Sequence, residues 1–168
     1  KGIESLVRAF KILLEKAPAA HLAIAGGFSD EAKRLQQIIQ EEHIDNIEFL
    51  GYIDKQHFAE VIGSSIATIC PSICYDNTPN SVYESLSYQR PVIVSKIGSL
   101  PEQIRHGIDG LHFEAGNEND LANQLFLLWQ NPELATQMGE AGFNHLQEEY
   151  SPQRHYEQLM MVFQRGIT

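Results

Sequence analysis

The chain has 168 residues, 43% of them hydrophobic and 20% charged, and its 12 lysines and arginines against 22 acidic residues give a net charge of −10 at pH 7. This length and composition are typical of one globular domain with a sizeable core. The acidic balance, without a cluster of basic residues, argues against a nucleic acid or an anionic membrane as partner, because both need positive charge on the protein.

The two cysteines, Cys70 and Cys74, are too few for a disulfide framework or a zinc ribbon, and we interpret them as reduced thiols of a cytoplasmic protein. The longest apolar runs are much shorter than the ~20 residues that a membrane-spanning helix needs. The seven histidines have no metal-ligand spacing, so no metal site is predicted. Because the chain starts at Lys1-Gly2 without a methionine, we expect it to be a fragment of a larger protein.

The first element is predicted to be a helix, because apolar residues between Ile3 and Leu14 recur every three or four positions. The apolar run 21–25 then ends at Gly26-Gly27 and precedes a second helical pattern, so that a strand, a turn and a helix follow one another. This cycle repeats, with further strands predicted at 47–50, 65–70, 91–95 and 111–113 and helices near 58–62, 79–88 and 101–106.

Strands that are apolar on both faces and separated by helices are typical of a parallel sheet covered on each side. We therefore predict a doubly wound α/β domain with helices on both faces and right-handed crossovers. From Asn117 onward the pattern is helical only, which predicts a helical C-terminal segment with helices at 121–129, 132–146 and 152–165.

In open parallel sheets, ligands bind beyond the carboxyl ends of the strands, where helix N-termini present free N–H groups. Gly26-Gly27 follows the first strand and would let a ligand approach the backbone closely. The Gly-x-Gly-x-x-Gly fingerprint and the Gly-Lys-Ser/Thr phosphate loop are both absent, which disfavours a dinucleotide site and a P-loop nucleotidase. Four loops are selected by this rule: 26–29, 51–54, 71–80 and 96–102.

The third loop is the richest in polar and turn-forming residues. Thr78 is predicted to cap the helix that follows, with Pro79 in its first turn. The amides of Asn80, Ser81 and Val82 are then left at the helix N-terminus, where they favour an anion. We therefore predict a phosphate site at this terminus.

Two carboxylates flank the same terminus, since Asp76 precedes the predicted cap and Glu84 lies one to two turns inside the helix. Carboxylates suit vicinal hydroxyls, as the acidic residue that holds a ribose in dinucleotide-binding folds illustrates. Phosphate-binding amides beside two acids predict a site for a nucleotide sugar. A second interpretation stays open on spacing alone, in which Asp76 is a surface turn residue and Glu84 a solvated acid that favours the helix dipole.

In the fourth loop, Ser99 and Glu102 fit a capping box at the start of a short helix on the same side of the sheet. This helix terminus is a candidate for a second phosphate contact. The alternative, for which the local pattern gives more support, is that the two residues cap only their own helix.

Taken together, the motifs resemble the C-terminal, donor-binding domain of retaining GT-B glycosyltransferases of the family 4 type. The resemblance covers essentially the whole chain. Its motifs are Lys1-Gly2, Leu22-Ala-Ile-Ala-Gly-Gly27, Ile47-Glu-Phe-Leu-Gly51, Pro71-Ser72, Asp76-x7-Glu84, Pro91-Val-Ile-Val-Ser95, Gly98-Ser-Leu-Pro-Glu102 and Gly107-x-x-Gly110.

The resemblance implies that residues 1–168 are a Rossmann-like half of a GT-B fold, which works against an N-terminal acceptor domain absent from this chain. It implies binding of a nucleotide diphosphate sugar, such as UDP-glucose or GDP-mannose, and transfer of the hexose to a glycan or glycolipid with retention. It also implies a cytoplasmic, metal-independent enzyme of polysaccharide biosynthesis that needs no cofactor. We expect the isolated domain to be inactive and to make no direct contact with a membrane.

The resemblance also assigns roles to residues. It implies catalytic roles for Asp76, at the donor-sugar hydroxyls near the reacting carbon, and for Glu84, at the ribose. The Asp replaces the usual Glu and has a shorter arm. The other expected donor and phosphate contacts are Lys1 at the pyrophosphate, Gly51, Tyr52 and Ser72 near the base, and Gly26, Gly27, Asn80, Ser81 and Val82 near the donor.

A further departure from the family pattern is Tyr88-Gln89-Arg90, where the family has a glycine at the end of the helix, so the geometry of that end is expected to differ. Two other functions stay open. One is a sugar-nucleotide epimerase, which shares the GT-B architecture. The other is a non-catalytic module that binds a nucleotide sugar.

Overall fold

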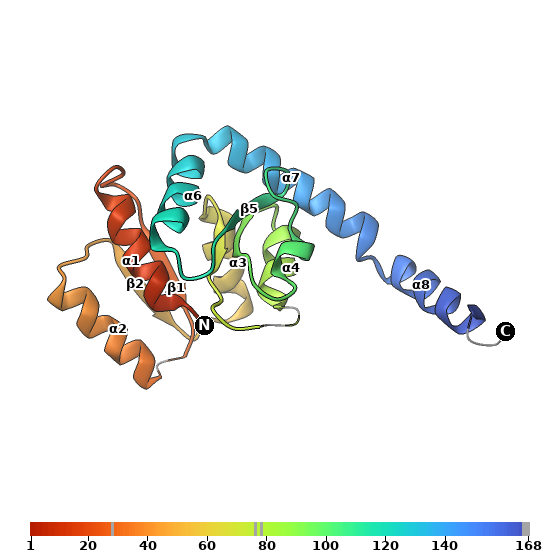
Figure 1. The fold of residues 1–168 in the computed structure, drawn as a ribbon, viewed down its shortest axis with the longest axis horizontal. Coiled ribbons are helices and arrows are strands. Elements are labelled where there is room, and N and C mark those ends of the chain that lie inside the picture. The colour runs from red at the N-terminus through yellow and green to blue at the C-terminus, as the bar shows by residue number, and fades with distance from the viewer. Residues whose placement is uncertain (28, 76, 78, 166–168) are drawn as a thin grey trace.

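The structure, a computed structural model, describes residues 1–27, 29–75, 77 and 79–165. Strands and helices alternate as far as the last strand and three helices follow, which confirms the predicted order (Figure 1). The elements are α1 (Ile3–Leu14), β1 (Leu22–Ala25), α2 (Asp30–Glu41), β2 (Ile47–Gly51), α3 (Lys55–Ser64), β3 (Thr68–Cys70), α4 (Asn80–Ser87), β4 (Val92–Ser95), α5 (Leu100–Gln103), β5 (Gly110–Phe113), α6 (Glu118–Gln130), α7 (Pro132–Glu149) and α8 (Pro152–Arg165).

All pairs of neighbouring strands are parallel: β1 with β2, β3 with β4, and β4 with β5. The predicted α/β fold class is therefore confirmed. Within the described residues the strands form two sheets, of orders β1-β2 and β3-β4-β5, because β1 and β3 are not hydrogen-bonded to each other.

Strand β4 separates two hydrophobic cores. Side chains alternate across a strand, so Val92 and Val94 pack with Val82 and Leu86 of α4 in one core. Ile93 points the other way, into a core built from residues of α1, α2, β5 and α6. Helices therefore cover both faces, as the doubly wound prediction requires.

The end of α4 reverses direction without a glycine. Gln89 adopts a left-handed φ of 55°, and the N–H of Arg90 donates a 3.0 Å hydrogen bond back to the carbonyl of Ser85. The Arg90 side chain also donates from Nε to the carbonyl of Ile62, at the end of α3. The left-handed turn that a glycine usually makes is thus present, and Arg90 ties it to α3.

Helices α6 and α7 pack against the body of the domain, whereas α8 extends away from it (Figure 1). In the part of the chain that the structure describes, no helix is long and apolar enough to cross a membrane.

Gly2 connects the start of α1 to the carboxyl end of β3. It has a left-handed φ of 79°, and a side chain at this position would collide with the carbonyl oxygen of Pro71. Its own carbonyl accepts a 3.1 Å hydrogen bond from the N–H of Leu6 in α1. The N-terminus of the chain is therefore held at the edge of the sheet where the strands end.

Replacing Gly2 by alanine should lower the free energy of unfolding by about 2–4 kcal/mol, since the left-handed φ costs an L-residue ~1–2 kcal/mol and overpacking adds a similar amount. Gly107 is the matched control, because it has the same φ of 79° and open space around it. Gly107→Ala should cost only about 1–2 kcal/mol. Equal losses in urea unfolding of the two variants would contradict the close approach at Pro71.

His112 of β5 is half-buried. Its Nε2 lies 2.6 Å from the carbonyl oxygen of Ile104, and its backbone N–H donates to Nδ1 of His106. Burial lowers the pKa of His112; the hydrogen bond to Ile104 opposes this effect and the charge on His106 adds to it. Because the folded pKa lies below the unfolded value of about 6.5, acidification protonates the unfolded chain first.

The stability contributed by neutral His112 is therefore complete above about pH 6.5 and is lost as the pH falls below it. Urea unfolding between pH 7.5 and 5.5 should show a shallower loss of stability in His112→Gln than in the wild type. If the free energy of unfolding falls equally with pH in the wild type and in His112→Gln, the loss of stability does not come from His112.

Candidate functional site

The loops after β1 and β2 place exposed residues at the carboxyl edge of the sheet. The N–H of Gly26 donates a 2.9 Å hydrogen bond to the carbonyl of Gly51 and so joins the two loops. Gly26 and Gly27 are exposed, and a side chain added at either would meet no atom within 4 Å. Gly51 is buried, whereas the neighbouring Tyr52 is 92% exposed. A ligand can therefore reach the backbone of the glycine pair and the ring of Tyr52.

The start of the loop after β3 is fixed by two buried serines. Ser95, at the end of β4, donates a 2.7 Å hydrogen bond to the carbonyl of Ser72. The hydroxyl of Ser72 donates in turn to the carbonyl of Cys74 at 3.0 Å. The predicted contact residue Ser72 thus lies at the carboxyl edge of the sheet, and its hydroxyl donates to a carbonyl of the protein.

Further along this loop, Asp76 and Thr78 lie outside the described residues. Between them, the carbonyl of Asn77 accepts hydrogen bonds from the Ser99 hydroxyl and from Gln103 Nε2. The predicted capping box is wrong, since Ser99 makes no side-chain cap to α5. Its hydroxyl instead connects α5 to the loop after β3.

Gln103 is a residue that the sequence interpretation missed. It is only 5% exposed, and its Nε2 donates to the Ser99 hydroxyl at 2.9 Å as well as to Asn77. Its Oε1 has no hydrogen-bond partner among the described residues. The spacing of four residues between Ser99 and Gln103, about one helical turn, could have indicated the hydrogen bond between them. The contact of Gln103 with Asn77 joins distant parts of the chain, so the local sequence does not indicate it.

Among the described residues, helix α4 begins without a side-chain cap at its N-terminus. The helix starts at Asn80, with Pro79 in the N-cap position and no side-chain cap. The prediction that placed Pro79 in the first turn is wrong by one residue. The N–H of Val82 donates to the carbonyl of Pro79 at 3.1 Å, so the predicted role of this amide at an anion is not supported. The backbone of Asn80 and Ser81 lies at the open end, and both residues are exposed.

Two further charged groups complete the predicted set. Glu84 is exposed on α4, one turn beyond Asn80, and Lys1 is exposed beside Gly2 at the same edge of the sheet. Another basic residue of this edge, Lys96, forms a 2.7 Å ion pair with Glu114, which raises the pKa of Lys96. Within the described ranges, no group of three or more His, Cys, Asp or Glu side chains could hold a metal ion.

This arrangement favours an anionic ligand with hydroxyl groups. Open amides and the positive end of the helix dipole at α4 stabilise negative charge. The exposed glycine pair allows close approach, and the carboxylate of Glu84 can accept hydrogen bonds from hydroxyls.

Comparison with known proteins identifies the family and the fold. Residues 1–145 match the family model described as glycosyl transferases group 1. The chain is 26% identical over 164 residues to the N-acetyl-alpha-D-glucosaminyl L-malate synthase of Bacillus anthracis. The aligned region covers 97% of this chain and 42% of the synthase. The chain therefore spans less than half the length of this curated relative.

Two solved structures share the fold. The C-terminal domain of the glycosyl transferase group 1 family protein LpcC from Francisella tularensis has a TM-score of 0.80 at 22% identity, covering 90% of this chain and 80% of that one. Anabaena Alr3699/HepE, solved with UDP-glucose, has a TM-score of 0.84 at 17% identity, covering 98% of this chain and 45% of that one.

The fold is thus the Rossmann-like half of a GT-B glycosyltransferase, of the C-terminal type. The chain belongs to the glycosyl transferases group 1 family.

Removing the Gln103 hydrogen bonds should loosen the loop after β3 without loss of the fold. Gln103→Leu keeps the side-chain volume nearly constant and removes a buried acceptor that has no partner. Chymotrypsin should cleave after the exposed Tyr75 several-fold faster in this variant. The exposed neighbour gives a matched control, Glu102→Gln, which should cleave at the wild-type rate; equal rates in all three proteins would contradict the role of Gln103.

Proposed function

We propose that this chain binds a nucleotide diphosphate sugar at the carboxyl edge of its sheet. Together with an N-terminal acceptor domain, it would transfer the hexose to a glycan or glycolipid with retention at the anomeric carbon. The observation that carries the proposal is the presence, at one edge, of an exposed glycine pair and a helix N-terminus without a side-chain cap. Membership of a glycosyltransferase family and the solved HepE complex with UDP-glucose support it.

The diphosphate would lie at the start of α4. The backbone N–H groups of Asn80 and Ser81 and the ammonium group of Lys1 would stabilise its negative charge, which grows as the diphosphate leaves. These donors are fixed by the fold before the reaction, so we propose that neither a divalent metal nor a cofactor is needed.

The acidic residues would hold hydroxyl groups. We assign Glu84 to the ribose and Asp76 to hydroxyls of the hexose near the reacting carbon. Asp76 would act mainly by orienting the sugar, a contribution made through geometry. The backbone of Gly51 and the ring of Tyr52 are proposed to lie beside the base, which is uracil or guanine in this proposal.

The reaction requires the second half of the cleft. The groups that we assign within residues 1–168 would bind the donor, and half a cleft cannot exclude water or hold an acceptor. We therefore propose that the isolated domain binds the donor and turns over little. A cytoplasmic location fits the two free cysteines, Cys70 and Cys74.

Calorimetric titration of the full-length protein with UDP, GDP and their glucose or mannose conjugates tests this assignment. Glu84→Gln should weaken binding of the preferred nucleotide about tenfold, because a hydrogen bond from the ribose to a charged acceptor contributes ~1.5 kcal/mol or more. Glu60→Gln, on the exposed face of α3, is the control and should bind as the wild type does. Unchanged affinity in Glu84→Gln, or no binding by a folded wild type, would contradict the proposed site.

A further inference from the structure

Helix α4 has eight residues and meets the core through one narrow stripe. At about 100° per residue, Val82 and Leu86 lie on the same side of the helix, and both are buried beside β4. Glu84 lies about 180° from the centre of this stripe, and it is exposed. The rotation of the short helix about its own axis therefore decides where the carboxylate of Glu84 points.

Two residues flank the buried stripe, one on each side. Tyr83 and Ser85 each lie about 80° from the centre of the stripe, in opposite directions. Because apolar packing is non-directional, the buried stripe alone resists rotation of the helix only weakly. Contacts on the two flanks therefore fix the rotation, and each flanking side chain has a defined partner.

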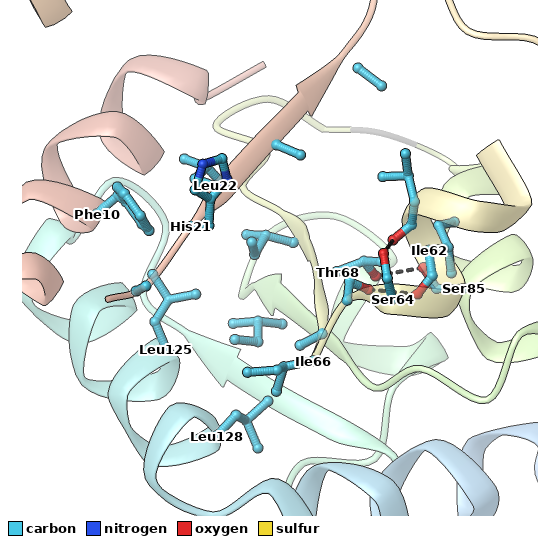
Figure 2. A pocket seen from close by; sticks show the side chains of 18 of the residues that line it. Phe10, His21, Leu22, Ile62, Ser64, Ile66, Thr68, Ser85, Leu125 and Leu128 are labelled. Carbon is cyan, nitrogen blue, oxygen red and sulfur yellow. Dashed lines mark hydrogen bonds between the residues drawn. The ribbon is translucent and has the colours of Figure 1, made fainter. Parts of the chain in front are cut away.

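The flank at Ser85 is tied to the sheet. The hydroxyl of Ser85 is hydrogen-bonded to the hydroxyl of Thr68 in β3, with 2.5 Å between the two oxygens (Figure 2). Thr68 is itself held in place, because its N–H donates a 3.1 Å hydrogen bond to the carbonyl of Pro91 beside β4.

The flank at Tyr83 is tied to α7. The ring of Tyr83 packs against the ring of Tyr150, with the ring centroids 4.8 Å apart and the planes inclined at 50°. Burial raises the pKa of Tyr83 to about 12, and a hydrogen bond to Tyr150 adds to this effect. Hydrogen bonds are directional, so this contact fixes the orientation of Tyr83 as well as its distance from α7.

Tyr150 is a fixed support for this contact. It follows the last residue of α7, and its N–H donates a 3.0 Å hydrogen bond to the carbonyl of Leu146. The ring of His145 meets the ring of Tyr150 edge-on, with 5.8 Å between the centroids. Earlier in α7, a side chain at Gly139 would collide with the carbonyl oxygen of Gln89, so α7 lies directly against the end of α4.

We propose that the contact between Tyr83 and Tyr150 sets the rotation of α4 and so aims the carboxylate of Glu84 at the donor. Tyr83 is a positioning residue that acts through Glu84, and Tyr150 supports it from α7. This inference rests on the proposed function, because it takes Glu84 as the group that binds the donor ribose.

Calorimetric titration of the full-length protein and its variants with UDP and GDP tests the proposal. Tyr83→Leu removes the ring contact and should weaken binding of the preferred nucleotide about fivefold, whereas Tyr83→Phe keeps the ring and should stay within about twofold of the wild type. Tyr150→Leu should weaken binding as much as Tyr83→Leu, and the double variant no further, because the two residues act through one contact. Tyr150 is 42% exposed, so Tyr150→Leu carries the test if Tyr83→Leu does not fold.

The decisive variant combines Tyr83→Leu with Glu84→Gln. A tyrosine that acts through Glu84 has no further effect once the carboxylate is removed, so this double variant should bind within about twofold of Glu84→Gln alone. The matched control is Tyr88→Leu, which removes a ring contact with Phe58 of α3 at the far end of α4. This control should bind the nucleotide as the wild type does.

Three results would overturn the inference and leave the proposed function standing. In the first, Glu84→Gln weakens binding but Tyr83→Leu and Tyr150→Leu do not. In the second, Tyr83→Leu weakens binding further in the Glu84→Gln background, so that it acts on another group. In the third, Tyr88→Leu weakens binding as much as Tyr83→Leu, which would indicate a general loosening of α4. Unchanged binding in Glu84→Gln would instead overturn the proposed site, and the inference with it.

Discussion

Strand β4 is the element on which the rest of the structure depends. Its residues Val92–Ser95 are all buried, and it pairs with β3 on one side and β5 on the other. Its alternating side chains enter two different cores, so helices on both faces are positioned by the same four residues. Its last residue, Ser95, also holds the carbonyl of Ser72 and so fixes where the loop after β3 begins.

The polar groups at the carboxyl edge fall into two sets. The hydroxyls of Ser95 and Ser99 and the amide of Gln103 hold the loop after β3 against β4 and α5. The hydroxyl of Ser72 donates within the loop. The glycine pair and Asn80 and Ser81 are exposed. The first set gives rigidity to the second, and a site built on fixed donors loses little entropy when the ligand binds.

The periodicity of apolar residues was sufficient to predict the order of elements and the parallel pairing, because each strand carries its own pattern. The rule about carboxyl ends placed Gly26 and Gly51 at the carboxyl edge of the sheet, where the structure has them. Ser99 was misassigned because a local capping pattern cannot reveal that the carbonyl of Asn77 competes for the hydroxyl. Within the described residues β1 and β3 do not pair, which was not predicted. The role of Asp76 stays a prediction.

The central claim is that a donor diphosphate binds at the N-terminus of α4. The most direct measurement is a crystal structure of the full-length protein with a bound nucleotide sugar. We expect phosphate oxygens about 2.7–3.2 Å from the backbone nitrogens of Asn80 or Ser81, with the nucleoside toward Gly51 and Glu84. A diphosphate bound elsewhere, with this helix terminus still facing solvent, would contradict it.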